Sequence, residues 1–249
     1  GLGTNPDLTA AIQESDLVIA VGVRLGELTT AGYSLIDIPQ PRQPLVHVYP
    51  GMEELGSVYY PALAMNASTD QFAAALGAFS PAPVERPWSK STRDLRQGYL
   101  DWTQPLPGRA DVNLSEVVCT LRDALPADAI IANGAGNYTA WVHRFHRYRA
   151  LGSQLAPTAG SMGYGLPAAV TAKLLYPKRT VVVFAGDGCF LMTGQELATA
   201  VQYRLAIVII VVNNNMLGTI RMHQEQRFPG RVIGTELVNP DFCALARAY

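Results

Sequence analysis

The sequence is short of charge and of cysteine, and both shortages limit what the protein can do. Nineteen basic residues nearly balance twenty acidic ones, which gives a formal net charge of −1. Such a chain has no strong electrostatic field to attract nucleic acid or an anionic membrane, so we expect neither as a partner. The cysteines, Cys119, Cys189 and Cys243, are odd in number and widely spaced. This pattern indicates a reducing compartment and predicts a cytoplasmic protein.

Long apolar runs and clustered histidines are also missing. The longest apolar run, LAIVIIVV at 205–212, has the length of a strand and falls short of the ~18 residues that a membrane span needs. His143 and His146 form the one close histidine pair, and without a third ligand nearby they make a poor metal site. The first residues, GLGTNP, look like a loop inside a domain, and the last, DFCALARAY, look like a helix. We therefore expect a fragment of a longer protein.

The sequence does contain an alternation of helix and strand patterns in its first part. About half of all residues are apolar, which suits a globular protein with a sizeable core. The predicted helices are 6–15 and 68–79, and the predicted strands are 16–23 and 44–50. Ser68 or Thr69 is the expected N-cap of the second helix. These elements are typical of an α/β fold, but they include too few strands to form a complete sheet by themselves.

Residues 80–112 differ from the rest because they are rich in proline and have little periodicity. A helix is possible only near 89–102. Proline-rich, aperiodic segments are typical of connections between domains, and we interpret 80–112 as one.

From residue 113 the alternation of helix and strand resumes. The expected helices are 114–125, 161–177 and 193–205, and the expected strands are 129–136, 180–188 and 206–215. Asn113 or Ser115 should cap the first of these helices, and Thr193 with Glu196 predicts a capping box on the third. Strands that alternate with helices predict an α/β fold, with parallel sheets flanked by helices.

Three of the predicted strands end in unusual loops: NGAGN at 133–137, GDG at 186–188 and NNN at 213–215. In parallel sheets, ligands bind beyond the carboxyl ends of the strands. The last two strands are joined by a single helix and are therefore expected to be neighbours, which would bring Asp187 and Asn214 to one crevice. A carboxylate and an amide oxygen suit Mg²⁺, and glycine backbone can approach phosphate closely. The sequence thus predicts a Mg²⁺–diphosphate site.

Each of these motifs also has a simpler interpretation. The GDG triplet alone is more typical of a tight turn than of a site. No GxxxxGK[ST] motif is present, and GSMGYG at 160–165 has the wrong spacing for a dinucleotide fingerprint. The combination of GDG on one strand with NN on the next is the more specific signal.

This combination resembles the signature of thiamine diphosphate-dependent enzymes: GDG, a helix containing QEL, and an apolar strand that ends in NN. The segments QELATAVQYRLAIVIIVVNNNMLG and GSMGYGLPAAVTAK are similar to the acetolactate synthase-like, 2-oxo acid decarboxylase branch. The segments SDLVIAVGVRLGE and PLVHVYPGMEELG are similar to the second half of that family's central domain. The resemblance implies that 1–79 is the C-terminal part of the central domain, 80–112 the connection, and 113–249 the domain that binds the diphosphate.

The resemblance also implies roles for individual residues. Asp187, Asn214 and the backbone carbonyl of Met216 match the Mg²⁺ ligands. The residues that match cofactor-binding positions are Gly134, Ala135, Gly136, Asn137, Gly186, Gly188, Cys189, Leu217 and Gly218. Gly160 and Met162 match the catalytic positions that accept from the cofactor's amino group and hold the cofactor bent. Cys189 stands where this branch often has serine, which weakens a hydroxyl contact to phosphate.

The activity implied by the resemblance is decarboxylation or carboligation of a 2-oxo acid, with thiamine diphosphate and Mg²⁺, in a homodimer or homotetramer. The glutamate that activates the cofactor in this family comes from a separate pyrimidine-binding domain, and no glutamate here sits in a matching motif. We therefore expect the 249 residues alone to contain half an active site and to be inactive.

Alternatives remain open at this point. Acetolactate synthases typically have a tryptophan after the position of Gly218, and here there is none. Arg221, His223 and Gln224 either line the pocket instead or form a solvated helix face. A simple decarboxylase, or a lyase acting on a larger 2-oxo acid or an acyl-CoA, is compatible with this departure. A non-catalytic nucleotide- or flavin-binding module and a structural subunit are further alternatives, and FAD binding is undecided.

Overall fold

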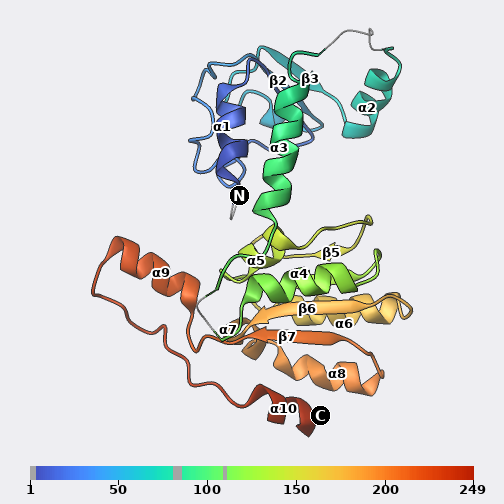
Figure 1. Ribbon diagram of the computed structural model, residues 1–249, viewed down its shortest axis with the longest axis vertical. Coiled ribbons are helices and arrows are strands. Elements are labelled where there is room, and N and C mark those ends of the chain that lie inside the picture. The colour runs from blue at the N-terminus through green and yellow to red at the C-terminus, as the bar shows by residue number, and fades with distance from the viewer. Residues whose placement is uncertain (1–3, 81–85, 109–110) are drawn as a thin grey trace. The chain divides into compact units, whose positions relative to one another are not determined.

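The computed structural model describes residues 4–80, 86–108 and 111–249 (Figure 1). The chain divides into two compact units, Gly1–Trp102 and Thr103–Tyr249. The connection predicted at 80–112 lies partly outside the described residues. The helix predicted within it is confirmed as α3, Ser89–Trp102, and belongs to the first unit.

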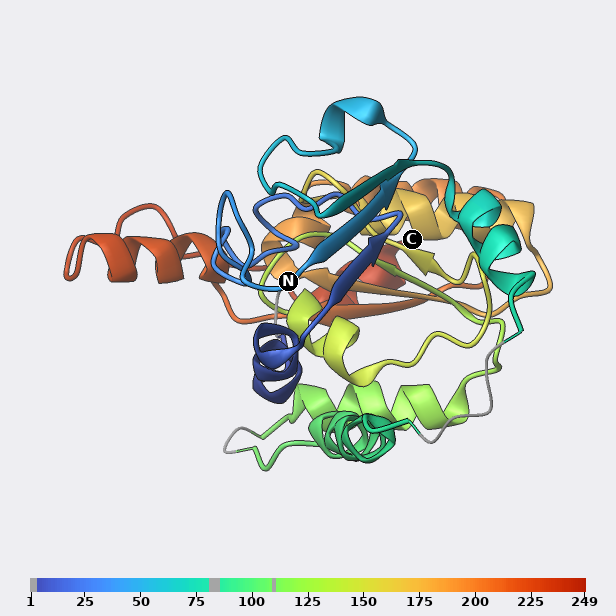
Figure 2. The same ribbon diagram turned by 90° about the horizontal axis from the view of Figure 1, so that it is seen from above.

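The first unit contains a three-stranded parallel sheet in the order β1-β2-β3 (Figure 2). Its elements are α1 (Pro6–Glu14), β1 (Val18–Val21), β2 (Leu45–Tyr49), the 3₁₀ turn Met52–Glu54, β3 (Leu63–Asn66), α2 (Thr69–Gly77) and α3. The two strands predicted here are confirmed, whereas β3 has no counterpart among the predictions. The sequence of β3, LAMN, contains no β-branched or aromatic residue and so lacks the composition typical of a strand.

Helix caps in the first unit follow from local side-chain chemistry. Asn5 caps α1 by accepting from the Asp7 amide at 2.9 Å. Of the two predicted caps of α2, Ser68 is the one observed, and it forms a reciprocal capping box with Gln71.

The second unit is built on a four-stranded parallel sheet in the order β5-β4-β6-β7. Its helices are α4 (Leu114–Ala124), α5 (Thr139–Phe145), α6 (Gly165–Leu175), α7 (Asp187–Leu191), α8 (Leu197–Gln202), α9 (Gly218–Arg227) and α10 (Phe242–Ala248), with a 3₁₀ turn at Gly194–Glu196. Its strands are β4 (Ile130–Asn133), β5 (Gln154–Leu155), β6 (Val181–Gly186) and β7 (Val208–Val212). Because β6 pairs with β7 in parallel, the predicted adjacency of these two strands is confirmed.

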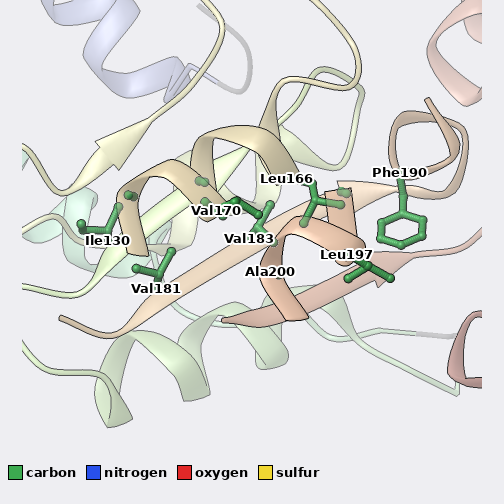
Figure 3. Packing of buried hydrophobic residues seen from close by; sticks show 12 residues of the cluster. Ile130, Leu166, Val170, Val181, Val183, Phe190, Leu197 and Ala200 are labelled. Atoms are coloured by element: carbon green, nitrogen blue, oxygen red, sulfur yellow. The ribbon is translucent and has the colours of Figure 1, made fainter. Parts of the chain in front are cut away.

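Helices cover both faces of this sheet, as the near-continuous apolar strands require. On β6, Val181 and Val183 pack with α6, α7 and α8, and Figure 3 shows this cluster together with Leu166 and Phe190. The alternate residues of β6 pack with α4 and α5 on the opposite face. The confirmed α/β architecture therefore holds the end of β6 in place from two sides.

The predicted capping box at 193–196 is wrong. Thr193 makes no capping hydrogen bond, and its hydroxyl donates instead to the Gly163 carbonyl at 2.9 Å. The Glu196 carboxylate accepts from the Thr199 hydroxyl rather than from the Thr193 backbone. The α-helix begins only at Leu197, after a 3₁₀ turn. The Thr193 side chain, which the local sequence predicts to be part of the cap, bonds the distant Gly163 carbonyl instead.

Helix α9 extends away from the sheet of the second unit in both views (Figures 1 and 2). None of its residues is fully buried. Among the described residues, no helix has the length and hydropathy required to span a bilayer.

Candidate functional site

The carboxyl ends of β4, β6 and β7 open into one pocket of about 490 Å³, a volume that includes its part open to solvent. Of the residues predicted to bind cofactor, the pocket is lined by Ala135, Gly136, Asn137, Met162, Gly186, Asp187, Gly188, Cys189, Asn214, Met216, Leu217 and Gly218. Tyr138, Val212, Thr219 and Ile220 complete the lining. The strand-end loops that the sequence singled out therefore meet at one place.

Asp187 is the first residue of α7 and follows β6 directly. The residue is only 3 % exposed. One carboxylate oxygen, Oδ1, accepts from the Gly188 amide at 2.9 Å, and the other, Oδ2, accepts from the Asn239 side chain at 2.7 Å. Within the described ranges, no ion pair involves Asp187. A buried carboxylate with only neutral donors is costly, and a bound cation would offset that cost.

Asn214 follows β7 and lies in the same pocket. Its side-chain oxygen accepts from the Met216 amide at 3.2 Å, which leaves a second lone pair available. Between them, Asn215 adopts a left-handed backbone with φ of 54°, a conformation that asparagine tolerates better than most residues. This reversal turns the chain from β7 toward Met216, whose backbone pairs with Glu236.

Close packing across the pocket depends on small residues. A Cβ atom on Gly188 would lie 2.7 Å from a Leu217 methyl and 3.5 Å from the Met162 methyl. A Cβ on Gly218 would lie 3.1 Å from the Asn214 amide nitrogen. These glycines leave room for backbone N–H groups to approach a ligand closely, which is the arrangement that phosphate recognition requires.

A reciprocal contact ties the β4 loop to the start of α9. The Asn137 backbone amide donates to the Thr219 hydroxyl at 3.0 Å, and that hydroxyl donates to the Asn137 side-chain oxygen at 2.9 Å. The two walls of the pocket are thereby fixed to each other although they lie far apart in sequence.

Cys189 points into the protein beneath the glycine loop. Its sulfur accepts from the Gly163 amide at 3.1 Å and lies 3.6 Å from the Tyr138 hydroxyl that donates to it. Burial, reinforced by Cys189, raises the pKa of Tyr138, so this hydroxyl stays protonated and able to donate. The Cys189 thiol therefore lines the pocket and also bonds Gly163 and Tyr138, which belong to two different loops.

Two of the predicted residues do not line the pocket. Gly134 is buried, and a Cβ there would lie 2.1 Å from the Cys189 sulfur, so its role in the structure is close packing. Gly160 is exposed in a turn with φ of 67°. Met162, two residues later, does line the pocket and packs over Gly188.

Arg221, His223 and Gln224, further along α9 than Thr219, lie outside the pocket. Arg221 forms an ion pair with Glu225 at 3.0 Å, and His223 is exposed. The Gln224 side chain bonds both backbone groups of Ile233, at 3.1 and 2.9 Å. In this structure the three predicted residues support the solvated-face interpretation, because none of them lines the pocket.

Sequence reasoning missed Asn239, whose side chain is the only one among the described residues that bonds the Asp187 carboxylate. Asn239 lies 52 positions from Asp187 and precedes Pro240, so its sequence context indicates only a turn before the N-cap residue Asp241. No local signal connects it to the pocket. Tyr138 and Thr219 were also missed, although each adjoins a predicted residue.

The arrangement combines hard oxygen donors with glycine backbone at the mouth of a parallel sheet. Among the described residues, no group of three or more histidine, cysteine, aspartate or glutamate side chains is placed to hold a metal. The donors present, one carboxylate with an amide and backbone oxygens, instead fit a hard cation that also takes ligands from a bound phosphate. The chemistry of the site thus fits Mg²⁺ with a diphosphate.

Two family models match this chain. Residues 134–249 match the thiamine pyrophosphate enzyme C-terminal TPP binding domain, and residues 1–76 match the thiamine pyrophosphate enzyme central domain. The first match begins at the glycine loop after β4 and includes the ends of β6 and β7. It therefore covers all of the pocket lining described above.

Curated relatives point the same way. The chain is 31 % identical over 245 residues to the acetolactate synthase large subunit of Parasynechococcus marenigrum, and 30 % identical over 241 residues to the acetolactate synthase isozyme 2 large subunit of Escherichia coli. Each alignment covers 96 % of this chain but only 39 % and 42 % of the respective relative. The chain thus spans about two fifths of the length of these proteins. From the two family models and these alignments we conclude that the chain belongs to the thiamine pyrophosphate enzyme family, in its acetolactate synthase-like branch.

Proposed function

We propose that the full-length protein binds thiamine diphosphate through Mg²⁺ and uses it to decarboxylate or carboligate a 2-oxo acid. The observation that carries this proposal is the buried Asp187 carboxylate, which shares a pocket with Asn214 and has only neutral partners in the part of the chain that the structure describes. In the proposal these two side chains and the Met216 carbonyl hold the metal. The glycine backbone at 186–188 would receive the diphosphate beside the metal.

The remaining residues of the pocket are assigned to positioning. We assign Ala135, Gly136 and Asn137 to the opposite side of the diphosphate, and Met162 to support of the organic part of the cofactor. We assign the Gly160 carbonyl to accept from the cofactor's amino group. When bound, the cofactor supplies an electron sink for the carbon that loses CO₂. The protein supplies orientation and a water-poor site.

The proposal extends to the assembly of the active site. The chain corresponds to about two fifths of the curated relatives, so we propose that the remaining parts of the protein complete the site in a homodimer or homotetramer. The 249 residues alone are then expected to bind the metal–diphosphate end weakly and not to turn over. The free cysteines suit a reducing compartment, and we propose the cytoplasm as the location.

The proposed function is tested by thermal melting of the full-length protein with thiamine diphosphate, with and without Mg²⁺. A ligand present at 100 times its Kd should stabilise the protein by about 2.7 kcal/mol. We expect a Mg²⁺-dependent rise in melting temperature in the parent, which Asp187→Ala lacks. Release of CO₂ from a panel of 2-oxo acids then identifies the substrate.

The matched control is Asp123→Ala, which removes an exposed carboxylate of α4 that pairs with Arg122. It should retain the full response to cofactor and metal. Equal stabilisation of the parent and of Asp187→Ala would remove Asp187 from the metal site, and absence of any response in the parent would refute cofactor binding.

A further inference from the structure

The side chain of Asn239 joins the ends of two strands beside the pocket. Its amide nitrogen, Nδ2, lies 2.7 Å from Asp187 Oδ2, 2.8 Å from Asn213 Oδ1 and 3.2 Å from Asn215 Oδ1. Asp187 begins the helix after β6, and the two asparagines follow β7. One NH₂ group therefore contacts both loops that carry the proposed metal ligands.

The orientation of this amide is determined by its surroundings. An NH₂ group has two hydrogens, so three oxygens around it share two donors. Rotating the amide by half a turn would place its oxygen against all three acceptors, which is strongly unfavourable. In the orientation observed, the Asn239 oxygen is buried and has no hydrogen-bond partner in the described part of the chain. Leaving a buried acceptor unsatisfied costs free energy, so the contacts of Nδ2 must outweigh that loss.

Backbone pairing between residues 235–237 and 215–217 places Asn239 beside the loop that follows β7. The Leu217 amide donates to the Thr235 carbonyl at 2.7 Å, and the Leu237 amide donates to the Asn215 carbonyl at 2.9 Å. Residues 235–237 thus run antiparallel to 215–217, and Asn239 arrives opposite Asn213 and Asn215. The bond from Asn239 to Asp187 links this paired segment to the start of α7, directly after β6.

We propose that Asn239 is a positioning residue of the metal–diphosphate site. Its amide holds one oxygen of the Asp187 carboxylate and fixes the 213–215 loop, so that the carboxylate and the Asn214 amide face the pocket together before the metal binds. The second lone pair of Asp187 Oδ2, and the whole of Oδ1 apart from its bond to Gly188, stay available to a cation. This inference rests on the proposed function, because it assigns the arrangement to metal–diphosphate binding.

A purely structural role makes a different prediction. If Asn239 only anchors the segment before α10, its loss should loosen residues 235–248 and leave the metal dependence of cofactor binding unchanged. If it orients the donors, its loss should weaken metal binding even where the fold survives. Partners that orient metal ligands typically contribute 10–100-fold to metal affinity.

The test compares the full-length parent with Asn239→Ala and Asn239→Leu, the latter keeping nearly the same side-chain volume without a donor. The first measurement is the Mg²⁺ concentration at which thiamine diphosphate binding is half-maximal, determined by calorimetry. The second is hydrogen exchange of the backbone amides of 213–218 in the absence of cofactor and metal. The matched control is Asn66→Ala, in which the lost side chain also donates to two oxygens, the carbonyls of Tyr49 and Pro50.

We expect both Asn239 variants to raise the half-saturating Mg²⁺ concentration by about 10-fold or more. We also expect them to accelerate exchange at 213–218 while the amides of β6 stay protected. Asn66→Ala should change neither quantity.

An unchanged Mg²⁺ requirement in folded variants would overturn the inference and leave the proposed function intact. If Asn239→Ala does not fold, Asn239→Leu carries the same comparison. If the parent itself binds no thiamine diphosphate, the proposed function fails, and the inference fails with it.

Discussion

The close approach of α6 to the loop after β4 gives the sharpest prediction for a single substitution. Gly165 begins α6, and a Cβ atom there would lie 2.8 Å from the Gly134 nitrogen and 2.9 Å from the Asn133 carbonyl carbon. It would also lie 3.1 Å from a Val183 methyl. Two of these three atoms belong to the backbone, so a side-chain rotation cannot relieve the collision. In Gly165→Ala, either the helix or the glycine loop must move.

The size of the effect follows from the cost of overpacking a tight core, about 1–3 kcal/mol. One kcal/mol shifts the melting temperature of a domain of this size by roughly 2–4 °C, so we expect a fall of about 2–12 °C. Because the displaced loop continues into Ala135 and Gly136 in the pocket lining, cofactor affinity should fall as well.

The assay is differential scanning calorimetry of the full-length protein, with Gly98→Ala as the control. Gly98 lies inside α3, and a Cβ there would have its nearest neighbour, an Asp7 oxygen, at an ordinary 3.7 Å. Alanine should stabilise that helix by up to about 1 kcal/mol. A Gly165→Ala protein that melts at or above the parent temperature would refute the account of packing at the base of the pocket.

Two further predictions concern His146, the C-cap residue of α5, and the loop that carries Met162. Burial, followed by the charges of Arg149 and Arg122, lowers the pKa of His146 below its ordinary value, so the folded protein favours the neutral ring. The neutral ring therefore contributes stability above the unfolded pKa of about 6.5, and this contribution is lost as the pH falls below that value. We expect the melting temperature of His146→Gln to decline less than that of the parent between pH 7 and pH 5. Equal declines in the two proteins would contradict this prediction. Thr193→Val removes the hydrogen bond to the Gly163 carbonyl with little change in volume and should cost about 1 kcal/mol in chemical denaturation, whereas an unchanged midpoint would show that this bond contributes nothing.

Much of the architecture could be predicted because it depends on patterns along the chain. Apolar runs separated by helical segments identified β4, β6 and β7, and the single connecting helix predicted that β6 and β7 are neighbours. That adjacency is what brought Asp187 and Asn214 to one pocket. Their role as metal ligands remains a proposal.

Other features could not be predicted because they depend on contacts between distant residues. The two-residue strand β5 and the seven-residue helix α5 are too short to show a period. Thr193 matched a capping box by spacing, yet it bonds a carbonyl 30 positions earlier. The contact of Asn239 with Asp187 spans 52 positions and has no sequence signature.

The most direct test of the central claim is anomalous diffraction from crystals of the full-length protein grown with thiamine diphosphate and Mn²⁺ in place of Mg²⁺. We predict one strong peak in the pocket, about 2.0–2.2 Å from oxygens of Asp187, Asn214 and the Met216 backbone. A metal peak elsewhere, or a cofactor bound with its diphosphate remote from Asp187, would contradict the account.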